Sequence, residues 1–290
     1  MIRKIPFMLI ALCFLLSCGG DDPLDIKPED DIKPEQPENP SEPEIKKKRI
    51  KALIVNHPAG LYTEDKLIYD NQGRITRIES YIKNTGWFDL PEYNAVTTFT
   101  YLEGKVINKI TCNGNSYQQI LELNDLGYVE KLTDSDNWSD LFEYWGDGRL
   151  KIKGECAYQY LNGNLSVVKG YYFSYMLLFE MSSIPNKAGI APVLLSGYYN
   201  TLSYSFLEDS EFDIAVHNSF YLFYNGLYGK PSVNLESTVT EGGEALYFEY
   251  ELDNDGYPKI IFCTELKDGM PIPSKSSEGA FTANIEYFED

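Results

Sequence analysis

A short turn motif recurs through this chain and constrains its fold more than any other feature. Each copy runs from an alternating aromatic or aliphatic segment through a polar turn to a glycine, and then into a similar segment. The copies occupy residues 67–75, 99–106, 121–129, 142–150, 158–165 and 248–257. Asp or Asn stabilises a type I turn, and glycine adopts the positive φ that lets the second strand return. Each copy therefore predicts a β-hairpin.

The spacing of these hairpins is irregular, which disfavours a strict solenoid or propeller and favours a meander of hairpins. Around residues 149–153, apolar and cationic side chains alternate as in a half-buried strand. We therefore predict an all-β, mainly antiparallel fold: a curved, barrel-like or half-barrel meander of β-hairpins with one or two short helices. The sequence leaves open whether the sheet closes into a barrel.

Further elements are expected outside the turn motif. Strands are predicted over residues 171–181, 197–206, 245–251, 259–264 and 281–288. Turn residues are fewer over 212–227, and a short helix is predicted over 214–224. The basic run at 46–49 leads directly into an apolar segment, and we interpret it as the solvated start of the first strand.

The N-terminus has the pattern of a bacterial lipoprotein export signal. Arg3 and Lys4 precede an apolar run at 5–16, which is shorter than the roughly 20 residues that span a bilayer. Leu15, Leu16 and Ser17 then stand directly before Cys18. Residues 1–17 are predicted to be a removed signal peptide, with Cys18 lipidated as the membrane anchor. The alternative is an ordinary cleaved signal peptide with a chance cysteine.

The segment after Cys18 is predicted to be a disordered tether. Residues 19–44 contain six prolines and ten acidic residues and almost no large apolar ones, so they bury too little surface to offset their ordering entropy. We expect a lipidated tether over 18–45 and a single antiparallel β domain over 46–290. The net charge of −19 argues against a nucleic-acid partner.

Several elements resemble those of a family of uncharacterised Gram-negative lipoproteins with a porin-like β fold. They are the lipobox, the acidic tether, and short segments at 162–165, 186–187, 228–235 and 255–260. Residues 69–74 also resemble the tyrosine-aspartate repeats of Rhs-type proteins. The family resemblance implies a curved, barrel-like sheet, and it assigns no active residues. By resemblance to such lipoproteins, the absence of Asp directly after Cys18 implies the outer membrane, and Asp21 and Asp22 imply the cell surface.

Catalytic patterns are sparse, and we expect no cofactor. The chain has two histidines and no Gly-x-Ser-x-Gly or His-Glu-x-x-His motif. A pair of carboxylates could still act on glycans, because that chemistry needs only two acids at a suitable separation. Asp134, Asp136 and Asp140 form a weak candidate calcium loop, but the glycine and glutamate positions of an EF-hand are missing. We interpret it as a solvated hairpin loop.

Cys112, Cys156 and Cys263 remain in the predicted domain. Either one disulfide forms and one thiol stays buried, or all three are small core residues. We favour the core interpretation because each cysteine lies within or beside a predicted strand.

Aromatic residues give the best indication of function. The chain has 23 tyrosines, and tyrosine suits half-buried strands, so packing explains most of them. Trp87, Trp138 and Trp145 are candidate ligand-binding aromatics. Three hypotheses follow: a non-enzymatic module that binds a glycan or an envelope protein, a glycan-active hydrolase with paired carboxylates, or a structural envelope component. We favour the binding module, which predicts exposed aromatic residues clustered on one face.

Overall fold

The computed structural model describes residues 47–58, 60–84, 92–170, 176–196, 218–272 and 280–289. Seventeen strands, one 3₁₀ helix and one α-helix occur within them. They are β1 (Ile50–Asn56), β2 (Leu61–Tyr69), β3 (Ile75–Asn84), β4 (Tyr93–Leu102), β5 (Lys105–Cys112), β6 (Asn115–Leu123), β7 (Val129–Asp134), β8 (Ser139–Tyr144), β9 (Leu150–Lys153), β10 (Cys156–Leu161), β11 (Asn164–Gly170), β12 (Met176–Pro185), η1 (Pro192–Leu195), α1 (Asn218–Tyr224), β13 (Asn234–Glu241), β14 (Glu244–Leu252), β15 (Pro258–Lys267), β16 (Met270–Pro271) and β17 (Phe281–Tyr287).

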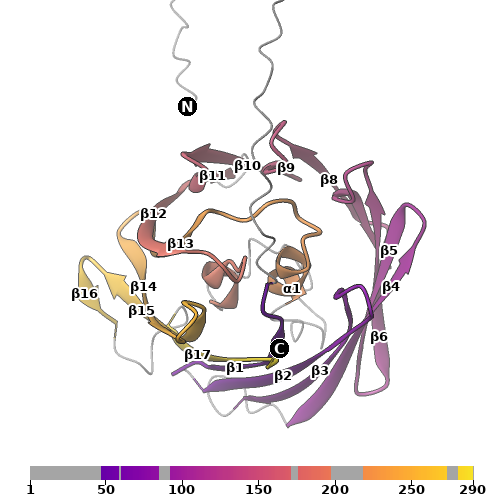
Figure 1. Cartoon of the computed structure of the whole chain (residues 1–290), viewed down its shortest axis with the longest axis horizontal. Helices are drawn as coiled ribbons and strands as arrows, with labels where there is room; N and C mark the ends of the chain where they lie inside the picture. The colour runs from indigo at the N-terminus through magenta and orange to yellow at the C-terminus, as the bar shows by residue number, and fades with distance from the viewer. Residues whose placement is uncertain are drawn as a thin grey trace, which may run out of the picture. The chain divides into compact units, whose positions relative to one another are not determined.

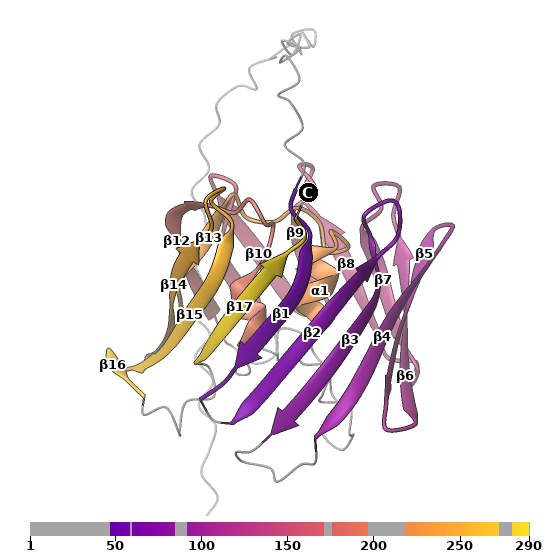
Figure 2. The ribbon, with the colours of Figure 1, turned by 60° about the horizontal axis from the view of Figure 1, so that its bottom comes forward.

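The strands form a closed antiparallel barrel (Figures 1 and 2). From β1 to β15 each strand pairs with the next, and β17 pairs with both β15 and β1. The short strand β16 branches off β15, so sixteen of the described strands make up the ring. The predicted all-β, barrel-like fold is therefore confirmed, and the question of closure is answered by the pairing of the first and last strands.

Several of the predicted hairpin turns are present with the expected geometry, whereas Asn162 as well as Gly163 has a positive φ in the turn between β10 and β11. In the turn after β2, Asp70 Oδ1 accepts hydrogen bonds from the main-chain N–H groups of Gln72 and Arg74, both at 2.9 Å. Gly73 has a φ of 79° and donates its N–H to the carbonyl of Asp70. The same arrangement recurs in the turns that begin at Asn124, Asp134 and Asp253. The motif predicted the turns at Asp70, Asn124 and Asp253 because local sequence defines them. The Asp134 turn has Asn137 in place of glycine at the positive-φ position.

Tyrosines near strand ends join neighbouring strands at one end of the barrel. Each hydroxyl donates to the main-chain carbonyl of the first residue of an adjacent strand. The bonds are Tyr69 to Ile50 at 2.6 Å, Tyr101 to Ile75 at 2.8 Å, Tyr144 to Val129 at 2.7 Å and Tyr287 to Pro258 at 2.9 Å. Burial raises the pKa of each of these four hydroxyls, so they remain protonated donors. For these tyrosines, the packing interpretation is correct.

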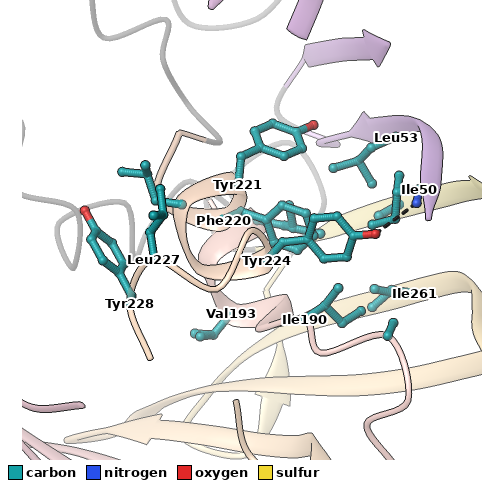
Figure 3. Close-up of a cluster of buried hydrophobic side chains, with 14 of the residues drawn as sticks. Ile50, Leu53, Ile190, Val193, Phe220, Tyr221, Tyr224, Leu227, Tyr228 and Ile261 are labelled. Carbon is teal, nitrogen blue, oxygen red and sulfur yellow. Dashed lines mark hydrogen bonds between the residues drawn. The ribbon is translucent and has the colours of Figure 1, made fainter. Parts of the chain in front are cut away.

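A plug fills the space inside the ring. We define the plug as residues 186–196 and 218–233, which contain η1 and α1 (Figure 1). Phe220 and Leu222 of α1 are almost fully buried. Tyr221 donates to Asp65 Oδ2 on β2 at 2.6 Å, and the Tyr224 hydroxyl accepts the N–H of Ile50 at 3.0 Å (Figure 3). Helix α1 matches the second part of the helix predicted over 214–224; residues 214–217 lie outside the described residues.

The outer face of the barrel is charged. Residues in β5 alternate between buried and more exposed positions, as a strand with one face in the core requires. Exposed positions carry ion pairs, many of them between neighbouring strands: Lys51–Glu286, Lys66–Glu64, Arg77–Glu79, Lys131–Glu122, Lys151–Glu143 and Lys267–Glu244. Barrels that cross a bilayer instead present an apolar band about 25 Å tall to lipid. The buried cluster inside the ring is mostly apolar, and the exposed positions combine these ion pairs with apolar side chains such as Leu141 and Leu161.

No helix in the described ranges is both long enough and apolar enough to cross a membrane.

Other sequence-based expectations can be placed in the structure. The strands predicted over 245–251 and 259–264 lie within β14 and β15, and that over 281–288 corresponds to β17. The strand at 171–181 overlaps β12, while 197–206 lies outside the described residues. Cys112, Cys156 and Cys263 are buried thiols in β5, β10 and β15, which confirms the core interpretation.

The basic run before β1 is not a simple solvated face, which corrects that interpretation. Lys48 Nζ lies 2.8 Å from Asp253 Oδ2, and Arg49 lies over the rings of Tyr69 and Phe288. These contacts join the start of β1 to the turn between β14 and β15 and to the C-terminal segment.

We predict that Tyr221→Phe lowers the free energy of unfolding by about 1–3 kcal/mol, because a buried carboxylate loses a donor from the plug. Chemical denaturation measures this change. Tyr62→Phe is the control, since its hydroxyl makes a longer bond of 3.4 Å to the partly exposed Glu64. Equal effects of the two variants would contradict a role for Tyr221 in seating the plug.

Candidate functional site

A groove of about 560 Å³ lies where the β8–β9 turn meets β10. Its wall contains an exposed indole, an ion pair, an amide and a phenol. The lining residues are Trp145, Gly146, Asp147, Arg149, Gln159 and Tyr160. The turn supplies the first four and β10 supplies the last two, so the groove exists only because β10 pairs beside β9.

The groove side chains are held in place. Trp145, 45% exposed, donates its indole N–H to the carbonyl of Tyr158 at 3.3 Å. The main-chain N–H of Arg149 donates to Asp147 Oδ1 at 3.1 Å, and the guanidinium pairs with the same carboxylate. These hydrogen bonds lower the pKa of Asp147, so it is ionised at neutral pH. The groove therefore presents the apolar indole of Trp145 beside hydrogen-bond donors and acceptors that are held in fixed positions.

The plug supports the turn that carries the groove. The N–H of Lys230 donates to the carbonyl of Gly148 at 2.9 Å. Gly229 has a φ of 87°, and a Cβ at that position would lie 2.6 Å from the same carbonyl oxygen. Sequence reasoning did not assign this role, although residues 228–235 were among the segments that carried the family resemblance.

The predicted aromatic site residues do not form one cluster. Trp145 follows β8, whereas Trp138 precedes it and is 38% exposed, so the two indoles lie at opposite ends of the strand. Trp87 and Cys18 lie outside the described residues. The structure thus separates Trp138 from Trp145 and gives only Trp145 a groove among the described pockets. Sequence analysis did not single out Asp147, Arg149, Gln159 and Tyr160, because their proximity depends on strand register.

The acidic residues of the candidate metal loop serve separate contacts. Asp134 Oδ1 accepts the main-chain N–H groups of Asp136 and Trp138, both at 2.9 Å, and so caps the turn. Asp140 is buried, and burial raises its pKa while the charge of Lys153 opposes that shift. In the part of the chain that the structure describes, no three His, Cys, Asp or Glu side chains group as metal ligands.

An internal cavity of about 60 Å³ lies between the barrel wall and the plug. Aromatic and aliphatic side chains form most of its lining, together with Lys153 of β9 and Glu236 of β13. Tyr160 lines both this cavity and the outer groove, which places the cavity behind the groove wall. Burial raises the pKa of Glu236 to about 8 and lowers the pKa of Lys153.

The two pockets bear on the paired-carboxylate hypothesis. Asp147 is the only carboxylate that lines the outer groove, and Glu236 is the only one that lines the internal cavity. A glycosidase site needs two carboxyl groups about 5–10 Å apart around the substrate. Neither described pocket provides such a pair among its lining residues.

The comparisons with known proteins bear on the fold. No protein-family model matches the chain, and no curated protein matches it. Among solved structures, it is similar to a porin-like protein from Bacteroides uniformis, with a TM-score of 0.58 and 17% identity over 83% of this chain and 98% of the other. A porin-like protein from Bacteroides vulgatus aligns over 83% and 99% of the two chains, with 11% identity and a TM-score of 0.32. The first similarity confirms the porin-like β fold.

We predict that Gly229→Ala destabilises the protein more than Gly127→Ala. Both glycines have positive φ, which costs an L-residue about 1–2 kcal/mol, but a Cβ at position 127 meets open space. At position 229 the Cβ also displaces the Gly148 carbonyl and the groove turn. Denaturation and Trp145 fluorescence measure the two effects. Identical behaviour of both variants would contradict support of the turn by the plug.

We predict that the contribution of Glu236 to stability falls as pH rises from about 4.5 to about 8, because the native state keeps a proton on Glu236 that the unfolded chain releases. Glu236→Gln removes this contribution and flattens the pH dependence of the unfolding free energy over that range. Urea unfolding across the range tests this. An unchanged slope in the variant would show that Glu236 is ionised in the native protein.

Proposed function

We propose that this protein is an outer-membrane-anchored lipoprotein that acts as a non-enzymatic binding module, with the groove at Trp145 as its glycan site. The observation that carries the proposal is the combination in one groove of an exposed, hydrogen-bonded indole with the Asp147–Arg149 pair and Gln159. Binding sites characteristically combine apolar surface with a few positioned polar groups.

The groove chemistry suits a sugar. A pyranose ring has an apolar C–H face that packs on an indole, and hydroxyls at its edge that both donate and accept hydrogen bonds. Asp147 accepts, Arg149 donates, and the Gln159 amide does both. Lys151 Nζ lies 5.6 Å from the indole centre of Trp145, and Lys151 is not among the residues that line the groove.

The outer surface supports a barrel that stands in water beside a membrane. Its ion pairs would be desolvated against lipid, and its interior is packed with apolar side chains. Together with the lipobox at Cys18 and the acidic tether, this favours attachment through lipid over insertion of the barrel. We place the domain on the cell surface, on the basis of Asp21 and Asp22 near the anchor.

A glycan array probed with the full-length chain, followed by calorimetry on each hit, tests the glycan proposal. Trp145→Ala is expected to weaken binding by about tenfold or more, equivalent to about 1.4 kcal/mol. Trp138→Ala is the matched control, because this indole is similarly exposed at the other end of β8, and it is expected to leave affinity unchanged. Equal losses in both variants, or no hit on the array, would overturn the proposal.

Replacing the anchoring cysteine tests the attachment. Cys18→Ala is expected to move the protein from the membrane pellet to the aqueous fraction, because two or more acyl chains are needed for a stable anchor and the variant has none. Immunoblotting of fractionated cells measures the shift. Retention of the variant in the outer membrane would show that the barrel itself is membrane-bound.

A further inference from the structure

The internal cavity is lined by a buried carboxyl group with one unpartnered oxygen. Glu236 on β13 is 4% exposed and lines the cavity, and its Oε2 has no hydrogen-bond partner among the described residues. Buried polar side-chain atoms in native proteins are normally hydrogen-bonded, and an exception requires an explanation. A ligand that brings a donor to Oε2 provides one.

The other charged group of the cavity is directed to other contacts. Lys153 on β9 places Nζ 5.2 Å from the ring centre of Tyr228, and the negative charge of Asp140 acts on it. A cation over an aromatic face with a carboxylate nearby is electrostatically compensated. Lys153 therefore does not serve as the hydrogen-bond donor to Glu236 Oε2.

The size and lining of the cavity define the class of ligand. The cavity volume of about 60 Å³ exceeds the roughly 30 Å³ share of one water molecule in the liquid, so the cavity admits a short chain of a few heavy atoms. Tyr158, Phe179 and Phe223 are among the lining residues. Aromatic faces attract cations, and a carboxylate gives its strongest hydrogen bonds to a charged donor.

We propose that this cavity binds the terminal ammonium group of a small primary alkylamine, with Glu236 as its acceptor and the aromatic side chains packed around the adjoining methylene groups. This ligand is distinct from the glycan of the outer groove, and the proposal stands independently of it.

Binding of the amine is coupled to a proton. The other titratable groups that line the cavity are Lys153 from β9, Tyr158 and Tyr160 from β10, and Tyr228 from the plug. Outside the lining, the Tyr250 hydroxyl on β14 donates to the main-chain carbonyl of Glu236 at 2.7 Å. Burial raises the pKa of Tyr160, Tyr228 and Tyr250, so these phenols stay neutral. Glu236 must lose its proton to receive an ammonium, so affinity for the amine should rise as pH increases toward 8.

Calorimetric titration of the full-length chain with propylamine tests the proposal, with propan-1-ol and acetate as neutral and anionic probes of similar size. Propylamine is expected to saturate one site, with propan-1-ol about tenfold weaker or worse and with tighter amine binding at higher pH. Glu236→Gln is expected to weaken propylamine binding by about tenfold and to abolish its pH dependence. Glu249→Gln, on the exposed face of β14, is the matched control and is expected to bind as the parent does.

Each contrary outcome is decisive. Saturable binding of acetate but not of propylamine would show that the cavity binds an anion through Lys153. Absence of binding by all three probes would show that the cavity holds only water. Equal propylamine affinity in the Glu236→Gln variant would show binding elsewhere. The pH dependence of the parent protein needs no variant, so the proposal stays testable if Glu236→Gln fails to fold.

Discussion

The width of a sixteen-strand ring is the constraint on which the rest of this structure depends. Eight strands enclose a space that their own side chains fill, whereas sixteen leave a channel. Here that space is occupied by the plug, whose Phe220 and Leu222 belong to the same buried cluster as the inward side chains of the strands. Closure and filling therefore stabilise each other, since the ring buries the plug and the plug packs against the inner face of the ring.

Polar contacts give this apolar interior a defined arrangement. Tyr221 and Tyr224 fix α1 to β2 and to the start of β1, while Tyr69 and Tyr101 join neighbouring strands at the barrel end. The plug also contacts Gly148 in the turn that carries the outer groove. As a result, the candidate glycan site and the internal cavity share the same supporting element, and both depend on how the plug is seated.

The sequence-based predictions were accurate for features that depend on contacts between residues close together in the chain, and not for features that depend on long-range contacts. The turns at Asp70 and Asp253 were predictable because their hydrogen bonds join residues two to four positions apart. The groove itself was not predictable, because Tyr160 reaches it only through the pairing of β10 with β9. The internal cavity was even less predictable from sequence, since Glu236 and Lys153 come from strands about eighty residues apart.

The sequence by itself determined the class of the fold, its hairpin turns and the lipoprotein pattern around Cys18, and it favoured burial of the cysteines in strands. These features depend on side-chain alternation and on short stretches of chain. Only the tertiary structure decided that the ring closes through β1 and β17, that α1 lies inside it, and that an unpartnered Glu236 oxygen lines a cavity. Those outcomes depend on tilt and register accumulated over sixteen strands, and no local segment of the chain encodes them.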